Sequence, residues 1–168
     1  MNTANNNIIL NNNEIEHKIR RIAYQIFESN NEEREIVIAG ISNNGFLFAK
    51  KIANVLEEIS PITVVLCEVF INKKRPIEAI KTSIDQDQYK NKALVLVDDV
   101  LNSGTTLIYA VKHFLEVPLK KFKTAVLVNR NHKKYPVKAD FKGISLSTSI
   151  KEHVAVEFNK DEIIAYLN

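Results

Sequence analysis

The chain of 168 residues has a hydrophobic fraction of 45% and a charged fraction of 26%, as expected for one globular domain with its own core. No apolar run approaches the roughly 20 residues that span a bilayer, and the N-terminal segment lacks the basic and apolar parts of a signal peptide. The single cysteine, Cys67, excludes an internal disulfide, so the sequence predicts a cytoplasmic protein without a membrane partner.

The net charge of +3 is unevenly distributed. Between Val117 and Lys151, many lysine and arginine residues stand against a single acidic residue, Asp140. Such a basic region indicates an anionic ligand, either a phosphorylated metabolite or nucleic acid.

The chain begins with a segment, residues 1–12, that we predict to be a mobile tail with a short apolar island at 8–10. From Glu14, isoleucines recur at helical spacing, which predicts an amphipathic helix with Asn13 as its N-cap.

Strands and helices then alternate. The predicted strands cover residues 35–40, 61–70, 93–99, 123–129 and 153–158, and the predicted helices cover 46–59 and a segment from about Thr105. Residues 70–91 show no period, and 161–168 fit either a helix or a strand. This alternation predicts an α/β domain with a mostly parallel sheet.

Two adjacent acids, Asp98 and Asp99, end the predicted strand 93–99. Ligands of open parallel sheets bind beyond the carboxyl ends of the strands. A loop with small hydroxyl side chains follows and opens a helix: Asn102, Ser103, Gly104, Thr105 and Thr106. Free N–H groups at such a helix start bind phosphate, while carboxylates accept hydrogen bonds from hydroxyls or hold Mg²⁺. The pattern therefore predicts a site for a sugar phosphate with a free diol.

Two other protein classes with acidic or glycine-rich motifs fit the sequence less well. Signalling receiver domains carry their acid pair on the first strand, whereas this pair lies past mid-chain. The segment GISNNGFL has glycines at Walker spacing, but Phe46 and Leu47 stand where a P-loop needs lysine and serine.

The stretch VLVDDVLNSGTTL resembles the phosphoribosyl pyrophosphate signature of type I phosphoribosyltransferases. The resemblance extends over nearly the whole chain and is greatest for the PyrR type, which combines attenuation of a pyrimidine operon with uracil phosphoribosyltransferase activity. It implies a single domain, 1–168, in which a parallel core sheet is flanked by helices and a small hood is built from residues 130–150.

The resemblance also implies roles for individual residues. Asp98 and Asp99 would be catalytic and bind the ribose hydroxyls, directly or through Mg²⁺, and Asn102 to Thr106 would hold the 5′-phosphate. The pyrophosphate loop, in which this family often has a non-proline cis peptide, would consist of Ser42, Asn43, Asn44 and Gly45.

Three further sets follow from the same resemblance. The lid over the reacting centre would carry the basic residues Lys73, Lys74 and Arg75. The base would be bordered by Lys138, Ala139, Asp140 and Phe141, with the Phe141 ring stacking on it. RNA or nucleotide would be contacted by Arg130 and His132.

We therefore expect a homo-oligomeric enzyme that transfers phosphoribose from phosphoribosyl pyrophosphate to a nucleobase, with uracil favoured. Its expected ligands are phosphoribosyl pyrophosphate and a nucleobase or nucleoside monophosphate. Three alternatives stay open. A nucleotide-responsive RNA-binding regulator with little catalysis is favoured by the absence of a basic residue from Ser42 to Gly45. A purine phosphoribosyltransferase is disfavoured by Asn102, where such enzymes often have aspartate. A ligand sensor would bind nucleotide alone.

Overall fold

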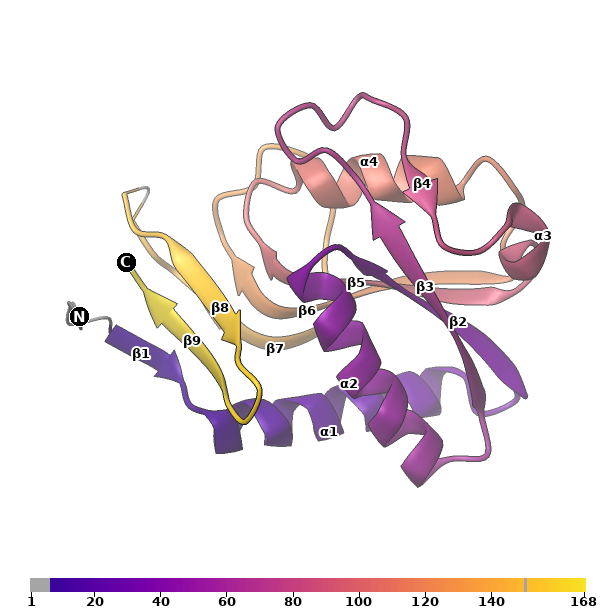
Figure 1. The fold of residues 1–168 in the computed structure, drawn as a ribbon, viewed down its shortest axis with the longest axis horizontal. Helices are drawn as coiled ribbons and strands as arrows, with labels where there is room; N and C mark the ends of the chain where they lie inside the picture. Colours follow the sequence, from indigo (N-terminus) through magenta and orange to yellow (C-terminus); the bar gives the residue numbers. More distant parts are fainter. Residues whose placement is uncertain (1–6, 150) are drawn as a thin grey trace.

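The computed structural model describes residues 7–149 and 151–168 and contains a core sheet with the strand order β4-β3-β2-β5-β6-β7 (Figure 1). The strands are β2 (Glu35–Ile41), β3 (Thr63–Phe70), β4 (Lys81–Thr82), β5 (Ala93–Leu101), β6 (Lys121–Arg130) and β7 (Phe141–Leu146). All run parallel except β4, which is antiparallel to β3. The α/β class with a parallel core sheet is confirmed.

Helices cover both faces of this sheet. They are α1 (Asn12–Ser29), α2 (Asn44–Ile59), the short α3 (Gln86–Tyr89) and α4 (Thr105–Phe114). Within β2, Ile36 and Ile38 pack in the cluster that contains α1 and α2, whereas Val37 and Ala39 pack in the cluster that contains Phe114 of α4. Because both faces are covered, the strand is apolar at nearly every position rather than at alternate ones.

Helix α1 begins earlier than the sequence pattern predicts. Its N-cap is Asn11, whose side-chain oxygen accepts a hydrogen bond from the Glu14 N–H at 2.9 Å, so the expected cap Asn13 lies inside the helix. The Asn12 side chain accepts from the Ile163 N–H at 2.9 Å. In a run of three asparagines the choice of cap depends on this distant strand, which the local pattern does not contain.

A second, antiparallel sheet joins the two ends of the described chain. Its strands are β1 (Asn7–Leu10), β8 (Val154–Phe158) and β9 (Ile163–Leu167), in the order β1-β9-β8. The prediction of a mobile tail over 1–12 is therefore wrong for residues 7–10, while residues 1–6 lie outside the described part. Leu10 packs beside Val156 and Ala165 in the core, which explains the apolar island.

The hood expected from residues 130–150 is placed differently. Residues 141–146 form β7, which extends the core sheet beside β6, and the small second sheet is built from the chain ends instead. The Arg21 side chain secures β7 by donating to the carbonyl oxygens of Lys142 and Gly143, each at 2.7 Å. A short edge strand interrupted by glycine gives little sequence signal, so β7 was missed.

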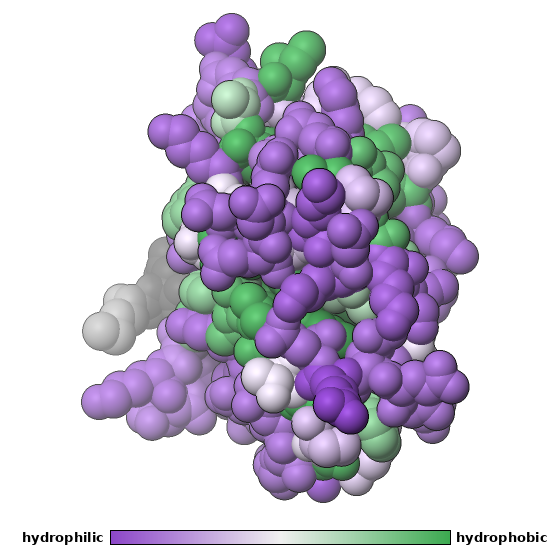
Figure 2. All heavy atoms as spheres, turned by 90° about the vertical axis from the view of Figure 1, so that its right-hand side faces the viewer, coloured by the Kyte–Doolittle hydropathy of each residue, from purple (hydrophilic) through white to green (hydrophobic). Residues whose placement is uncertain are grey.

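The surface shows no strong apolar feature on the side drawn in Figure 2, where hydrophilic side chains predominate and smaller hydrophobic areas lie between them. Among the described residues, no helix is long and apolar enough to cross a membrane. The expected homo-oligomer stays a prediction.

Candidate functional site

The strand order reverses between β2 and β5. After β2 the chain enters α2 on one face of the sheet, and after β5 it enters α4 on the other face (Figure 1). The loops beyond these two neighbouring carboxyl ends diverge and leave a crevice, which is where parallel α/β sheets bind ligands.

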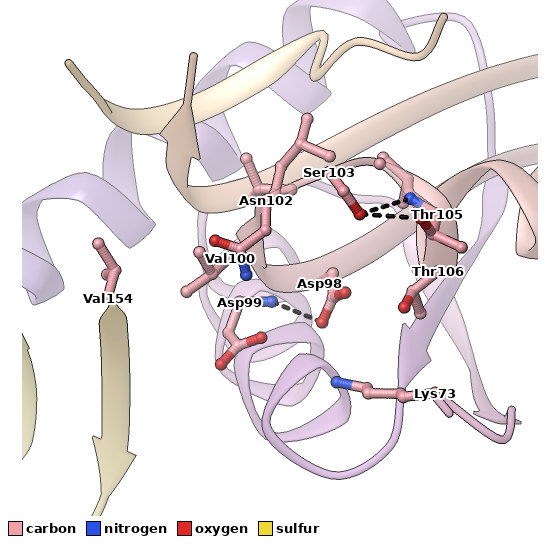
Figure 3. Close-up of a pocket in the computed structure, with 13 residues that line it drawn as sticks. Lys73, Asp98, Asp99, Val100, Asn102, Ser103, Thr105, Thr106 and Val154 are labelled. Carbon is pink, nitrogen blue, oxygen red and sulfur yellow. Dashed lines mark hydrogen bonds between the residues drawn. The ribbon is translucent and has the colours of Figure 1, made fainter. Parts of the chain in front are cut away.

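A cleft of about 220 Å³ lies at this point (Figure 3). It is lined by Lys73, Asp98, Asp99, Val100, Leu101, Asn102, Ser103, Gly104, Thr105, Thr106, Leu107, Val126 and Val154. The acid pair and the whole hydroxyl loop predicted from the sequence therefore share one cavity.

The acid pair is partly removed from water. Asp98 is 5% exposed, and its side-chain oxygen accepts a hydrogen bond from the Asp99 N–H at 2.9 Å. Burial raises the pKa of Asp98 well above its ordinary value, the charge of Asp99 raises this pKa further, and the positive charge of Lys73 counteracts the rise. An acidic pair in a cleft with one buried member is unfavourable for folding and is characteristic of functional sites.

The loop after β5 is held in a conformation that leaves the start of α4 open to the cleft. Gly104, the N-cap of α4, has a φ of 86°. The Ser103 and Thr105 hydroxyls lie 2.8 Å apart, and the Ser103 carbonyl accepts from the N–H groups of Lys134 at 2.8 Å and Tyr135 at 3.2 Å. Unpaired N–H groups in the first turn of a helix and the adjacent hydroxyls together suit a phosphate group.

Replacing Gly104 with alanine is expected to lower both stability and phosphate affinity. The left-handed backbone is strained for alanine, and a Cβ here would lie 2.6 Å from the Val137 Cγ1 atom. We expect a loss of about 1–2 kcal/mol in the free energy of unfolding, measured with urea, and weaker binding of inorganic phosphate. Asn91→Ala is the matched control, because Asn91 also has positive φ (62°) but does not line the cleft. Equal phosphate affinity in both variants would contradict this role of Gly104.

The predicted pyrophosphate loop packs against the acid pair. It contains the expected non-proline cis peptide, between Ser42 and Asn43. The Asn44 side chain donates to the Asp99 carboxylate at 3.2 Å and to the Val156 carbonyl of β8 at 2.8 Å. A Cβ on Gly45 would lie 3.0 Å from the Asp98 backbone and carboxylate, which is tighter than usual, so glycine favours this close approach.

Arg130, which the family resemblance assigns to an RNA or nucleotide contact, is a buried side chain. The residue is 7% exposed, and each of its three side-chain nitrogens donates within the chain. The acceptors are Thr148 Oγ1, Asn102 Oδ1 and the carbonyl oxygens of Ser149 and Glu152. Arg130 therefore connects the phosphate loop to the segment that leads into the small sheet. His132 is exposed, and its ring hydrogen-bonds to the Thr148 carbonyl.

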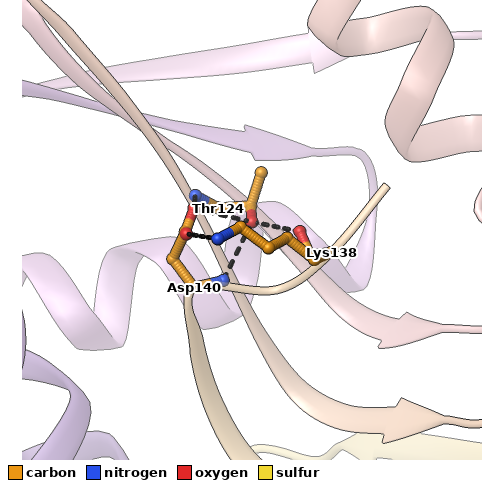
Figure 4. A network of polar contacts seen from close by, with 3 residues as sticks. All are labelled: Thr124, Lys138 and Asp140. Atoms are coloured by element: carbon orange, nitrogen blue, oxygen red, sulfur yellow. Dashed lines mark hydrogen bonds and ion pairs between the residues drawn. The ribbon is translucent and has the colours of Figure 1, made fainter. Parts of the chain in front are cut away.

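The residues predicted to border the base are not among those that line the cleft. Two of them, Lys138 and Asp140, contact Thr124 (Figure 4). The Asp140 carboxylate accepts from the Thr124 N–H at 2.9 Å and lies 3.4 Å from the Lys138 ammonium. Ala139 packs under α4, and Phe141 packs against the core cluster of α1. That cluster lies on the other face of the sheet from α4, and the stacking of the Phe141 ring on the base stays a prediction.

Sequence reasoning missed part of the cleft wall. Val126 of β6 and Val154 of β8 line it, but an apolar residue in a strand gives no signal beyond burial. Of the three predicted lid residues, Lys73 lines the cleft, whereas Lys74 and Arg75 do not.

The geometry agrees with comparisons to known proteins. Residues 5–161 match the family model described as phosphoribosyl transferase domain. The chain is 34% identical to the bifunctional protein PyrR of Geobacter sulfurreducens, covering 93% of each chain, and 35% identical to that of Clostridium novyi, covering 89% of this chain and 88% of the relative. The fold is similar to that of the hypoxanthine phosphoribosyltransferase of Trypanosoma cruzi, with a TM-score of 0.75, 15% identity and 95% coverage of both chains.

Proposed function

The chain belongs to the phosphoribosyltransferase family, and from that premise we propose that it transfers the phosphoribosyl group of phosphoribosyl pyrophosphate to a pyrimidine base, uracil above all. The observation that carries the proposal is that an acid pair and a phosphate-binding loop line one cleft. A ribose phosphate needs both, because its hydroxyls donate to carboxylates while its phosphate accepts from N–H and O–H groups.

In the proposed reaction the bond between ribose C1 and the pyrophosphate oxygen breaks, and its electron pair stays on that oxygen. A ring nitrogen of the base supplies the electron pair for the new bond to C1 and releases its proton to the departing pyrophosphate. Asp98 and Asp99 hold the ribose hydroxyls, while the loop from Asn102 to Thr106 holds the 5′-phosphate. Fixing both ends of the sugar keeps C1 aligned between the incoming and leaving groups.

The donor set suits a Mg²⁺ ion that is shared with the substrate. Among residues 7–149 and 151–168, no group of three or more potential ligands gathers at one point, so the protein offers the carboxylates of Asp98 and Asp99 only. Mg²⁺ is typically held by one or two carboxylates together with substrate phosphates and water. When bound, the ion would neutralise negative charge on the pyrophosphate.

The base preference rests on the PyrR-type relatives, which cover most of the chain at over 30% identity. The solved structures of hypoxanthine phosphoribosyltransferases are below 25% identical and inform the fold alone. The cytoplasmic location expected from the sequence stays a prediction.

The test is a panel in which each nucleobase is incubated with phosphoribosyl pyrophosphate and Mg²⁺ while pyrophosphate release is followed. We expect release with uracil and at least about 100-fold less with hypoxanthine or guanine, because a site built for one set of donors and acceptors leaves buried groups unpaired with another. Release with a purine alone would overturn the pyrimidine assignment.

A second candidate function is a nucleotide-responsive RNA-binding regulator. It is favoured by one observation: Ser42 to Gly45, beside the acid pair, carry no positive charge for a leaving pyrophosphate. Filter binding to the leader RNA of its own operon at increasing salt distinguishes the two, since phosphate contacts make affinity fall with salt. No binding at low salt would remove this candidate.

A further inference from the structure

The two acids of the cleft are held in different ways. Asp98 is buried, and its carboxylate accepts a hydrogen bond from the Asp99 N–H at 2.9 Å (Figure 3). Burial is the first cause of the raised pKa of Asp98 and the charge of Asp99 is the second, so the two carboxylates repel each other. The Asp99 side chain is only half-buried, and the terminal torsion of an aspartate is soft. The Asp99 carboxylate therefore needs a partner to keep one orientation.

Asn44, the first residue of α2, supplies this partner. Its amide nitrogen donates to the Asp99 Oδ2 atom at 3.2 Å and to the Val156 carbonyl oxygen of β8 at 2.8 Å. A carboxylate and a carbonyl oxygen only accept hydrogen bonds, so the amide nitrogen, and not the amide oxygen, has to face both of them. The nitrogen carries two hydrogens, and the two contacts use both. The Asn44 side chain therefore cannot turn away from Asp99 without losing its contact with β8.

The donor on Asn44 is uncharged, which leaves the negative charge of Asp99 for a ligand. A lysine or arginine at this position would form an ion pair with the acid, and its cation would compete with ribose hydroxyls or Mg²⁺ for the carboxylate. An ionised carboxylate has about four lone-pair positions, so one hydrogen bond at Oδ2 leaves acceptors for the sugar. An amide thus fixes the direction of the carboxylate and preserves its charge.

The small sheet anchors this contact. Val156 is buried in the core beside Leu10 and Ala165, and its strand pairs with β9. The same strand contributes Val154 to the wall of the cleft. The second acceptor of Asn44 is therefore a main-chain atom of a paired strand, so one side chain joins the acid pair, the start of α2 and the sheet built from the chain ends.

We propose that Asn44 is a positioning residue, which acts through Asp99 by holding its carboxylate toward the ribose hydroxyls. The inference rests on the proposed function and gives Asn44 a role at the sugar, whereas the family resemblance assigns this residue to the pyrophosphate loop. Without the amide, the 5′-phosphate would still bind to the loop after β5, but ribose C1 would no longer be aligned with the incoming base.

The test compares a ligand that has the ribose hydroxyls with one that lacks them. Titration calorimetry in the presence of Mg²⁺ should give a Kd for ribose 5-phosphate about tenfold higher for Asn44→Ala than for the unaltered protein. The Kd for inorganic phosphate should stay the same, because this ligand has no sugar hydroxyl for Asp99. Asn44→Asp keeps the size of the side chain and suits a helix start, but it cannot donate and it repels Asp99. It should bind ribose 5-phosphate at least as weakly as Asn44→Ala.

Asn30→Ala is the matched control for a general loss of stability. The Asn30 side chain is buried at the end of α1 and does not line the cleft, and its amide donates to the Ile26 carbonyl at 2.8 Å. Urea denaturation should show that both alanine variants are less stable than the unaltered protein. Only Asn44→Ala should lose affinity for ribose 5-phosphate.

Turnover provides the second readout. With uracil, kcat should fall by about 100-fold in Asn44→Ala, because the sugar is bound but misaligned. An equal Kd for ribose 5-phosphate in Asn44→Ala and the unaltered protein overturns the inference. An equal loss of affinity for inorganic phosphate also overturns it, because a merely structural role of Asn44 would weaken both ligands. Absence of turnover by the unaltered protein with every base overturns the proposed function instead, and the binding arm still decides the role of Asn44.

Discussion

Replacing Asp98 and Asp99 together with asparagine is expected to reduce binding of phosphoribosyl pyrophosphate below detection by calorimetry and turnover by about three orders of magnitude or more. Both carboxylates line the cleft, and the amide cannot accept as many hydrogen bonds from hydroxyls or hold Mg²⁺ as firmly. Titration of the variant with the substrate and Mg²⁺ measures the first effect, and pyrophosphate release measures the second.

The same double variant should not be less stable in urea. Burial and the neighbouring Asp99 raise the pKa of Asp98, so the ionised form is disfavoured in the folded state and its removal relieves repulsion. A matched control changes two exposed aspartates outside the cleft, Asp87→Asn with Asp161→Asn, and should retain binding. If the Asp98 and Asp99 variant binds substrate like the parent, the site is assigned wrongly.

Arg130→Met is expected to destabilise the protein by about 3 kcal/mol. Methionine fills a similar volume in the buried position of Arg130, but it removes the donor for the acceptors on Asn102, Thr148, Ser149 and Glu152. Urea denaturation measures the loss of stability. Phosphate affinity should also fall by about tenfold, because the Asn102 side chain loses the contact that positions the loop.

Arg20→Met is the control for Arg130→Met, because the Arg20 side chain is half exposed and its ion pair with Glu58 lies at the surface. Such pairs contribute about 0–1 kcal/mol, so this variant should unfold close to the parent. Similar stability of the two variants would show that the Arg130 contacts are energetically unimportant.

The core of the site could be predicted because its parts are contiguous in the chain. Strand β5 with its two acids near the carboxyl end, the hydroxyl loop and α4 follow one another within residues 93–114. The local pattern therefore suffices to place them on one edge of the sheet. The relation of Ser42–Gly45 to this edge followed from the family resemblance, and in the structure the Asn44 side chain of this loop donates to the Asp99 carboxylate.

The parts of the fold and of the site that were not predicted depend on contacts between residues far apart in the sequence. Nothing in a basic segment distinguishes a buried arginine from an exposed one, so the hydrogen bonds of Arg130 within the chain could not be predicted. The local pattern did not show β7, and it therefore did not show the face of the sheet on which the Phe141 ring packs. Residues 7–10 were assigned to a tail because their partner β9 lies at the opposite end of the chain.

The most direct test of the site is a crystal structure of the protein with phosphoribosyl pyrophosphate and Mg²⁺. We predict that the 5′-phosphate lies within hydrogen-bonding distance of the N–H and O–H groups of Asn102–Thr106. The ribose hydroxyls should lie on Asp98 and Asp99 or on a Mg²⁺ ion that they hold. A substrate bound elsewhere, or bound in this cleft with its pyrophosphate rather than its 5′-phosphate on the Asn102–Thr106 loop, would contradict this prediction.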